Sequence, residues 1–373
     1  MAYFPTFCWS DQWWIEGTQA WFVTAEKNIL MQYDMEKEIG KVLGKVPSAD
    51  GLRWNPECMK YNDEIVCFPD RGKHVWIYSL KTHEWEKVTI WKGEGENKRK
   101  TCQYILRDGS NIYFASRGLG QLYILDMGTK QIAEYDINII HKNNSGIEFK
   151  GLSNGVVIGR YIFWAFNETS YILMMDRYNH ECTVRKLELE VQIRRIQADK
   201  DNIWIVGLDK SVYVWQPRTN ALERVSNFPT TFGGYMREDD NWAISLKNEK
   251  FLKPLFGVPV INEGFVWLIP WYGTEILYID KRTLKIHNFL IRDEESNVDS
   301  LNMLKCRYLI NYVREERYIG IFSSKTGRQI EIDTREKKYR NINILIEKKD
   351  LKGFNPIIER NKDMLITLLT QMV

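Results

Sequence analysis

Histidine and cysteine are both scarce in this chain, and neither forms a pattern that would hold a metal ion. The 373 residues include five histidines and six cysteines. No C-x-x-C, H-x-H or H-E-x-x-H spacing occurs, so no local metal site is expected, although one assembled from distant histidines stays open. The same scatter gives no readable Ser-His-Asp or Cys-His nucleophile. We therefore expect neither a metal nor a cofactor.

Long apolar runs are also missing. No segment approaches the roughly 20 apolar residues that a helix needs to cross a bilayer. Residues 1–7 lack the basic start and apolar core of a secretory signal. The scattered cysteines, among them Cys67 inside an apolar run, are typical of reduced and buried thiols. The sequence therefore predicts a cytoplasmic protein without a membrane partner.

The chain carries little excess charge of either sign. It has 52 basic and 49 acidic residues, a formal net charge of +3. A nucleic-acid surface needs a clustered basic face, and the densest basic run, Lys92–Lys100, is interrupted by glutamate and glycine. That run reads as a solvated loop, and we expect no nucleic-acid partner.

What the chain does contain is one hairpin pattern repeated throughout. In the stretch Asn111–Thr129, two apolar runs flank a glycine-bearing turn, and Asp126 with a polar turn ends the second run. Seven copies keep a separation of 13 or 14 residues between the first apolar residue and the closing position. The copies are Trp21–Asp34, Ile65–Ser79, Ile112–Asp126, Ile162–Asp176, Ile203–Gln216, Val266–Asp280 and Ile319–Asp333.

The closing position of each copy has a defined chemistry. Aspartate occupies it in five of the seven copies, with Ser79 and Gln216 as the departures. A polar turn follows, so the carboxylate is expected to accept backbone N–H groups of that turn.

Weaker strands flank each hairpin, which gives four short strands per unit and closing positions 40 to 64 residues apart. Runs such as Ile162–Phe166 are apolar at consecutive positions, as in sheets packed on both faces. Stacking such sheets around an axis covers both faces of each one. The pattern therefore predicts an all-β fold, a seven-bladed β-propeller of four-stranded antiparallel blades.

Two segments do not follow the repeat. The widest spacing admits residues 227–257, which we expect to form a long loop over one face of the ring rather than an eighth blade. The tail, residues 346–373, is expected to supply a strand that closes the ring against the first blade, and a helix packed on the side of the ring is the alternative. Residues 1–373 would thus make one propeller domain.

The repeats resemble those of Kelch-type and related seven-bladed propellers. Asn202–Trp215 also resembles blades of bacterial sensor-kinase propellers and streptogramin lyases. The double glycine of a Kelch repeat and the Trp-Asp pair of the WD class are absent. The resemblance therefore implies the architecture and a bacterial setting, and it does not carry a function.

Ligands of propellers bind where the hairpin loops and interblade loops meet at one mouth of the channel. Charged and amide groups lie there beside aromatic rings, which suits a polar ligand that bears a ring, such as a sugar or peptide. Loop residues are commonly polar because loops face water, so the alternative for each single residue is that it only contacts solvent. The candidates are Arg53, Trp54, Asp70, Arg71, Arg117, Asn167, Glu168, Asp209, Tyr235, Trp271 and Tyr272.

The aromatic content, 14 Trp and 19 Tyr, is the one compositional excess, and packing between blades accounts for most of it. Trp54, Trp271 and Tyr272 fall outside the apolar runs and are the expected anchors. We expect a non-catalytic module that binds or scaffolds a protein or peptide. Two alternatives stay open: an enzyme, either a lyase or a glycan-active hydrolase working at the channel mouth, and a carbohydrate or small-ligand sensor.

Overall fold

The structure is a computed structural model. It describes residues 3–5, 10, 12–24, 28–47, 57–69, 73–90, 102–116, 120–137, 151–208, 210–230, 232, 255–273, 275–292, 307–323, 326–347 and 349–350. The fold is all-β, with seven blades of four antiparallel strands, and each of the seven predicted hairpins is confirmed as the central strand pair of one blade. The chain divides into two compact units, residues 1–99 with 291–373, and residues 100–290.

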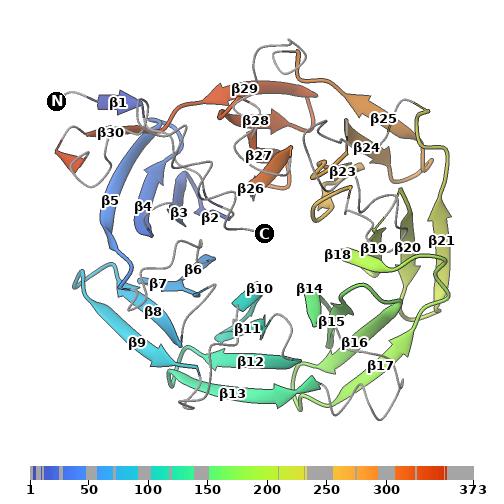
Figure 1. The fold of residues 1–373 in the computed structure, drawn as a ribbon, viewed down its shortest axis with the longest axis horizontal. Coiled ribbons are helices and arrows are strands. Elements are labelled where there is room, and N and C mark those ends of the chain that lie inside the picture. Colours follow the sequence, from blue (N-terminus) through green and yellow to red (C-terminus); the bar gives the residue numbers. More distant parts are fainter. Residues whose placement is uncertain are drawn as a thin grey trace, which may run out of the picture. The chain divides into compact units, whose positions relative to one another are not determined.

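The first unit holds blades 1, 2 and 7 (Figure 1). Two of its inner strands, β2 (Trp14–Glu16) and β6 (Cys58–Tyr61), were not predicted from the sequence because they are short and have no regular apolar pattern. Blade 1 is β2 (Trp14–Glu16), β3 (Gln19–Val23), β4 (Ile29–Asp34) and β5 (Ile39–Lys45); blade 2 is β6 (Cys58–Tyr61), β7 (Glu64–Cys67), β8 (His74–Ser79) and β9 (Trp85–Thr89); blade 7 is β26 (Tyr308–Arg314), β27 (Tyr318–Ser323), β28 (Gln329–Asp333) and β29 (Lys338–Ile342).

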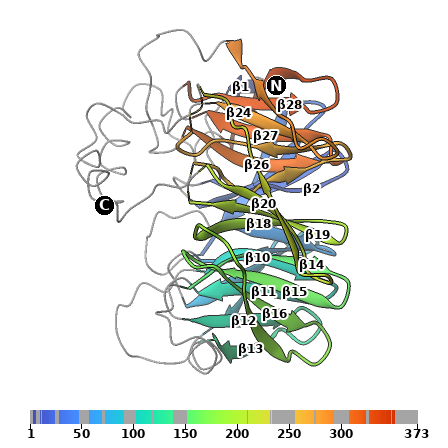
Figure 2. The ribbon, with the colours of Figure 1, turned by 90° about the vertical axis from the view of Figure 1, so that its right-hand side faces the viewer.

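The second unit holds blades 3 to 6, which are seen from the side in Figure 2. They are β10 (Cys102–Asp108), β11 (Asn111–Ser116), β12 (Gln121–Asp126) and β13 (Gln131–Asp136); β14 (Leu152–Ile158), β15 (Tyr161–Phe166), β16 (Tyr171–Asp176) and β17 (Cys182–Lys186); β18 (Ile193–Asp199), β19 (Asn202–Gly207), β20 (Val212–Gln216) and β21 (Ala221–Val225); β22 (Val260–Ile261), β23 (Phe265–Leu268), β24 (Ile276–Asp280) and β25 (Ile286–Phe289).

The two described ends of the chain meet on the outer edge of blade 1. Strand β30 (Leu345–Glu347) pairs in parallel with β5, and β1 (Tyr3–Pro5) pairs antiparallel with β30. Blade 1 thereby becomes a six-stranded sheet, ordered β1-β30-β5-β4-β3-β2. The start of the tail thus ties the chain to the first blade, while the rest of the predicted closure, residues 351–373, lies outside the described residues. So does most of the predicted loop 227–257.

The middle strands of the blades are buried on both faces, as their unbroken apolar runs predicted. Side chains from neighbouring blades form shared cores; Trp164 and Leu173 of blade 4, for example, pack in one cluster with Tyr113 of blade 3. Trp164 lies over Gly155 of the neighbouring strand, where a Cβ atom would come within 2.7 Å of the indole. Within the described residues, no helix is both long and apolar enough to span a membrane.

The turn after each hairpin is built as the closing residues predicted. In blade 6, the Asp280 carboxylate accepts the backbone N–H groups of Arg282 at 3.0 Å and Thr283 at 2.8 Å. Aspartates 34, 126, 176 and 333 accept N–H groups of their own turns in the same way. Ser79 substitutes through its hydroxyl, which accepts the N–H of Thr82 at 3.1 Å.

A second regularity of these turns left no trace in the sequence. The residue four positions after the closing residue has a left-handed backbone, with φ between 52° and 60°, in all seven blades. None of the seven is glycine, although glycine is the residue that adopts this conformation without strain. They are Glu38, His83, Lys130, His180, Asn220, Leu284 and Lys337.

The turn carboxylates should make stability depend on pH, and Asp333 offers the clearest test. Its carboxylate accepts the turn N–H groups of Arg335 and Glu336, and it pairs with both Nε and Nη2 of Arg317, the latter at 2.5 Å. Arg317 first, then the backbone N–H groups, lower the pKa of the Asp333 carboxyl below its ordinary value. A lowered pKa in the folded state contributes stability above the pKa of the unfolded chain, about 3.9, and loses it as pH falls further.

We expect Asp333→Asn to lower the free energy of unfolding by roughly 1–2 kcal/mol at pH 7. The difference from wild type should shrink below about pH 4, once the wild-type carboxyl becomes protonated. Urea titrations at pH 7 and pH 3 measure it. Glu336→Gln, at a side chain that is 54% exposed in the same turn, is the control. If the difference in free energy of unfolding between wild type and Asp333→Asn stayed constant with pH, the ionised Asp333 carboxylate would not be the stabilising group.

Candidate functional site

Four of the predicted ligand residues lie in described loops, and all four belong to the second unit. Asn167 and Glu168 lie between β15 and β16, and Trp271 and Tyr272 lie between β23 and β24, so their predicted positions in hairpin loops are confirmed. Their role in binding stays a prediction. The other candidates lie outside the described residues: Arg53, Trp54, Asp70, Arg71, Arg117, Asp209 and Tyr235.

The inner strands of blades 3, 4 and 5 each contain a β-bulge. Each contains a shift of register near its start, between Gln103 and Leu106 in β10, Leu152 and Gly155 in β14, and Ile193 and Arg195 in β18. A bulge leaves residues unpaired and turns their side chains out of the regular alternation. Strand β14 lies next to both β10 and β18, so the three bulges are neighbours (Figure 1).

Polar side chains of the β14 bulge fasten it to β18. The side-chain amide of Asn154 donates to the carbonyl of Ile196 at 2.5 Å and accepts the N–H of Ile196 at 3.0 Å. The hydroxyl of Ser153, which is fully buried, donates to the carbonyl of Arg194 at 2.6 Å. Strands β14 and β18 belong to different blades and share no backbone hydrogen-bond ladder. These side-chain hydrogen bonds therefore fix β18 against β14.

Arg195 places a positive charge inside this junction, with only 3% of its surface exposed. Its Nη1 donates to the Ser153 hydroxyl at 3.0 Å and to the carbonyl of Arg194 at 2.8 Å. The guanidinium carbon lies 4.7 Å from the ring centre of Tyr104 and 5.3 Å from that of Trp271. Aromatic faces attract cations most strongly when water is excluded, so both rings help to retain the buried charge.

Arg194 brings a second guanidinium to the same indole, 5.9 Å from the ring centre of Trp271. Its Nη1 donates to the side-chain oxygen of Asn167 at 3.0 Å, while its buried Nε has no hydrogen-bond acceptor. Tyr104, Ser153, Arg194, Arg195 and Trp271 together are called the arginine–tryptophan cluster below. It gathers two cations and a partly exposed indole at one end of blades 3 to 6.

The loop that carries Trp271 is held rigidly. The carbonyl of Leu255 accepts the N–H groups of Trp271, Tyr272 and Gly273, at 2.9, 3.3 and 3.1 Å. Phe232 stacks on Phe256 with ring centres 5.1 Å apart, and a Cβ atom at residue 273 would come within 3.1 Å of the Phe232 ring. A fixed loop loses little conformational entropy when a ligand binds, which favours a binding role for the indole.

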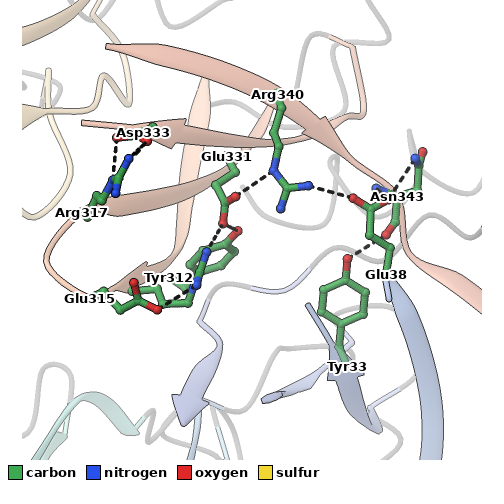
Figure 3. A network of polar contacts seen from close by, with 10 residues as sticks. Tyr33, Glu38, Tyr312, Glu315, Arg317, Glu331, Asp333, Arg340 and Asn343 are labelled. Atoms are coloured by element: carbon green, nitrogen blue, oxygen red, sulfur yellow. Dashed lines mark hydrogen bonds and ion pairs between the residues drawn. The ribbon is translucent and has the colours of Figure 1, made fainter. Parts of the chain in front are cut away.

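A second charged network lies in the first unit and serves a structural purpose (Figure 3). The carboxylate of Glu331, 3% exposed, accepts the hydroxyl of Tyr312 at 2.8 Å and Nε of Arg340 at 2.9 Å. Arg340 also pairs with Glu38 at 3.2 Å, which links blade 7 to the turn before β5 of blade 1. Burial first, then the Glu331 carboxylate, raise the pKa of the Tyr312 hydroxyl well above its ordinary value.

Metal-ligating groups do not gather into a site in the part of the chain that the structure describes. No group of three His, Cys, Asp or Glu side chains there is placed to hold a metal ion. Cysteines 58, 67, 102 and 182 carry free thiols. Burial raises the pKa of the Cys58 thiol to about 12 and that of the Cys182 thiol to about 11, which disfavours the reactive thiolate.

Sequence reasoning found one member of the arginine–tryptophan cluster, Trp271, which was an expected anchor. Arg194 and Arg195 were not among the candidates, and both lie in β18. Tyr104 and Ser153 were missed because each lies within a strand. The usable signal was the polar pair Ser153-Asn154 in an otherwise apolar inner strand, which marks a bulge.

Comparisons with known proteins support the architecture and name no family. No family model matches the chain, and no curated protein matches it. Virginiamycin B lyase from Staphylococcus aureus is similar in structure, with a TM-score of 0.60 and 12% identity over 88% of this chain and 97% of the lyase. The fold is that of a seven-bladed β-propeller.

Two further propellers are similar. The Cps50 (Swd1) propeller domain of Myceliophteria thermophila has a TM-score of 0.58 and 11% identity over 88% of this chain and 96% of that domain. BamB from Moraxella catarrhalis has a TM-score of 0.50 and 10% identity, over 84% and 81% of the two chains. At these identities the likeness concerns the fold alone, so the propeller repeats are not assigned to the Kelch family.

Proposed function

We propose that this propeller is a non-catalytic module that binds a protein or peptide, and that the arginine–tryptophan cluster is its anchor. One observation carries the proposal: two guanidinium groups and a partly exposed indole are fixed together on rigid strands and a rigid loop. Tryptophan and arginine are the side chains that contribute most binding energy in protein interfaces. Solved structures of similar fold include BamB, the Swd1 propeller domain and a chain of the Mitotic Checkpoint Complex, the last of which is by its name an assembly.

The support beneath the cluster suits this role. Ser153 and Asn154 tie two blades together through the backbone of Arg194 and Ile196, so a partner would meet a surface that does not have to be ordered on binding. The partner class, the cytoplasmic setting and the absence of catalysis are parts of the proposal.

Affinity capture from the source organism, with quantitative mass spectrometry, tests the proposal. The protein carrying both Trp271→Ala and Tyr272→Ala is expected to lose at least about 90% of the specifically captured partner, because loss of an interface anchor costs roughly 2 kcal/mol or more. The fold should survive, as judged by its circular dichroism spectrum and melting temperature.

Tyr178→Ala provides the matched control. Tyr178 is 75% exposed in the turn after β16, at the opposite end of blade 4 from Asn167. Its replacement removes an aromatic ring from the surface without touching the cluster, and capture should be unchanged. Equal capture by the doubly substituted protein and wild type would reject the cluster as the binding face.

A further inference from the structure

We infer that the arginine–tryptophan cluster recognises a carboxylate, so that the partner of this propeller presents an acidic side chain or a chain terminus to Arg194. The inference rests on the proposed function and adds the chemistry of the group that is bound. It starts from the guanidinium of Arg194, whose Nη1 is engaged by the neutral oxygen of Asn167 and whose Nε is buried without an acceptor.

The geometry of a guanidinium decides which edge remains for a ligand. The five N–H groups of arginine lie in one plane and match the two oxygens of a carboxylate when a pair of nitrogens points at it. With Nη1 held by Asn167 and Nε buried, Nη2 is the nitrogen of Arg194 that remains for a ligand oxygen.

The charge at this position also favours an anion. Arg194 and Arg195 both lie within 6 Å of the centre of one indole ring, so two positive charges share a small, partly buried volume. No carboxylate of the described residues forms an ion pair with Arg194. Glu168, whose backbone N–H donates to the carbonyl of Ile193 at 3.2 Å, is the acidic residue of the adjoining loop. A ligand carboxylate on Arg194 would bring a negative charge into this partly buried volume, where the attraction is stronger than in bulk water.

Trp271 shapes the ligand beyond its charge. Both guanidinium groups lie against the indole, which keeps their planes from rotating freely and leaves an apolar surface beside them. A free inorganic anion would use only the charges, whereas a peptide would place its carboxylate on Arg194 and a side chain against the ring. The structure therefore favours a carboxylate on a peptide over a small ion.

Fluorescence anisotropy with labelled peptides tests this on the full-length protein. The probes are hexaglutamate with an amidated C-terminus, hexaglutamine with the same ends, and hexa-alanine with a free C-terminal carboxylate. Hexaglutamate is expected to bind and hexaglutamine to bind at least about tenfold more weakly. Binding of hexa-alanine would assign the site to chain termini, and its failure beside bound hexaglutamate would assign it to acidic side chains.

Variants locate the effect. Arg194→Gln should weaken hexaglutamate binding by about tenfold or more, while Glu168→Gln should strengthen it by removing a nearby negative charge. Arg218→Gln is the control, since it removes the same charge from a side chain that is 77% exposed in the turn after β20. Added salt should weaken the wild-type interaction only partly, because buried pairs are screened less than exposed ones.

The outcomes separate this inference from the function beneath it. Equal binding by Arg194→Gln and wild type, equal binding of hexaglutamate and hexaglutamine, or no binding of either carboxylate peptide would overturn the carboxylate inference. If the Trp271 and Tyr272 variant then still lost its captured partner, the binding module would stand with a neutral ligand. If capture were also unchanged, both would fall.

Discussion

Replacing Glu331 by leucine is expected to lower the free energy of unfolding by roughly 3–5 kcal/mol, the usual cost of leaving buried charges without their partner. The carboxylate is the common acceptor for Tyr312, Arg314 and Arg340, and 3% of it is exposed. Leucine keeps much of the volume but accepts no hydrogen bond. The Tyr312 hydroxyl would remain buried and unsatisfied, and Arg314, whose side chain is 18% exposed, would lose this ion-pair partner.

Guanidinium chloride titrations measure the free energy of unfolding of Glu331→Leu and of two comparison variants. Glu331→Gln retains one acceptor oxygen and should cost less than Glu331→Leu, about half as much, because only the charge is lost. Glu315→Ala, at a side chain that is 62% exposed and pairs with Arg314, should change stability by no more than about 0.5 kcal/mol. If Glu331→Leu matched Glu315→Ala, the network would be a surface feature with no structural role.

The blades could be predicted because their evidence is local and periodic. A hairpin that must bury both faces shows as two consecutive apolar runs, and a closing aspartate such as Asp280 reports the turn that it caps. The inner strands of blades 1 and 2 were not predicted, since β2 has only three residues and β6 four. Their pairing is set by the neighbouring hairpin rather than by their own composition.

The left-handed residues of the turns escaped prediction for a different reason. Glycine is the usual sign of a positive φ, yet His83, Lys130 and Leu284 occupy the position. In blades 2, 3 and 6, the N–H of this residue donates to the carbonyl of the closing residue at 2.8 to 2.9 Å. The hydrogen bond of the turn therefore sets the positive φ, whichever side chain the residue carries. The arginine–tryptophan cluster also escaped prediction. Strand residues are predicted to point alternately to the two faces of a sheet, and a bulge breaks this alternation.

Gly320→Ala is expected to be the most damaging single-methyl change in the first unit. A Cβ atom at residue 320 would lie 2.0 Å from one ring atom of Tyr312 and 2.4 Å from two others. The ring cannot move aside, because it is buried, stacks on Trp13 at 5.2 Å and holds Glu331 through its hydroxyl. Overpacking of a close-packed core commonly costs 1–3 kcal/mol, and we expect about 3 kcal/mol or more here.

Non-additivity distinguishes this steric cause from a general intolerance of alanine. Gly264→Ala is the control, since a Cβ atom there would meet nothing within 4 Å, and it should alter stability by no more than about 0.5 kcal/mol. Tyr312→Ala removes the ring and is destabilising by itself, but adding Gly320→Ala to it should cost little more, because the clash has gone. Fully additive losses in the double variant would mean that Gly320 is required for its backbone and not for the space that it leaves to Tyr312.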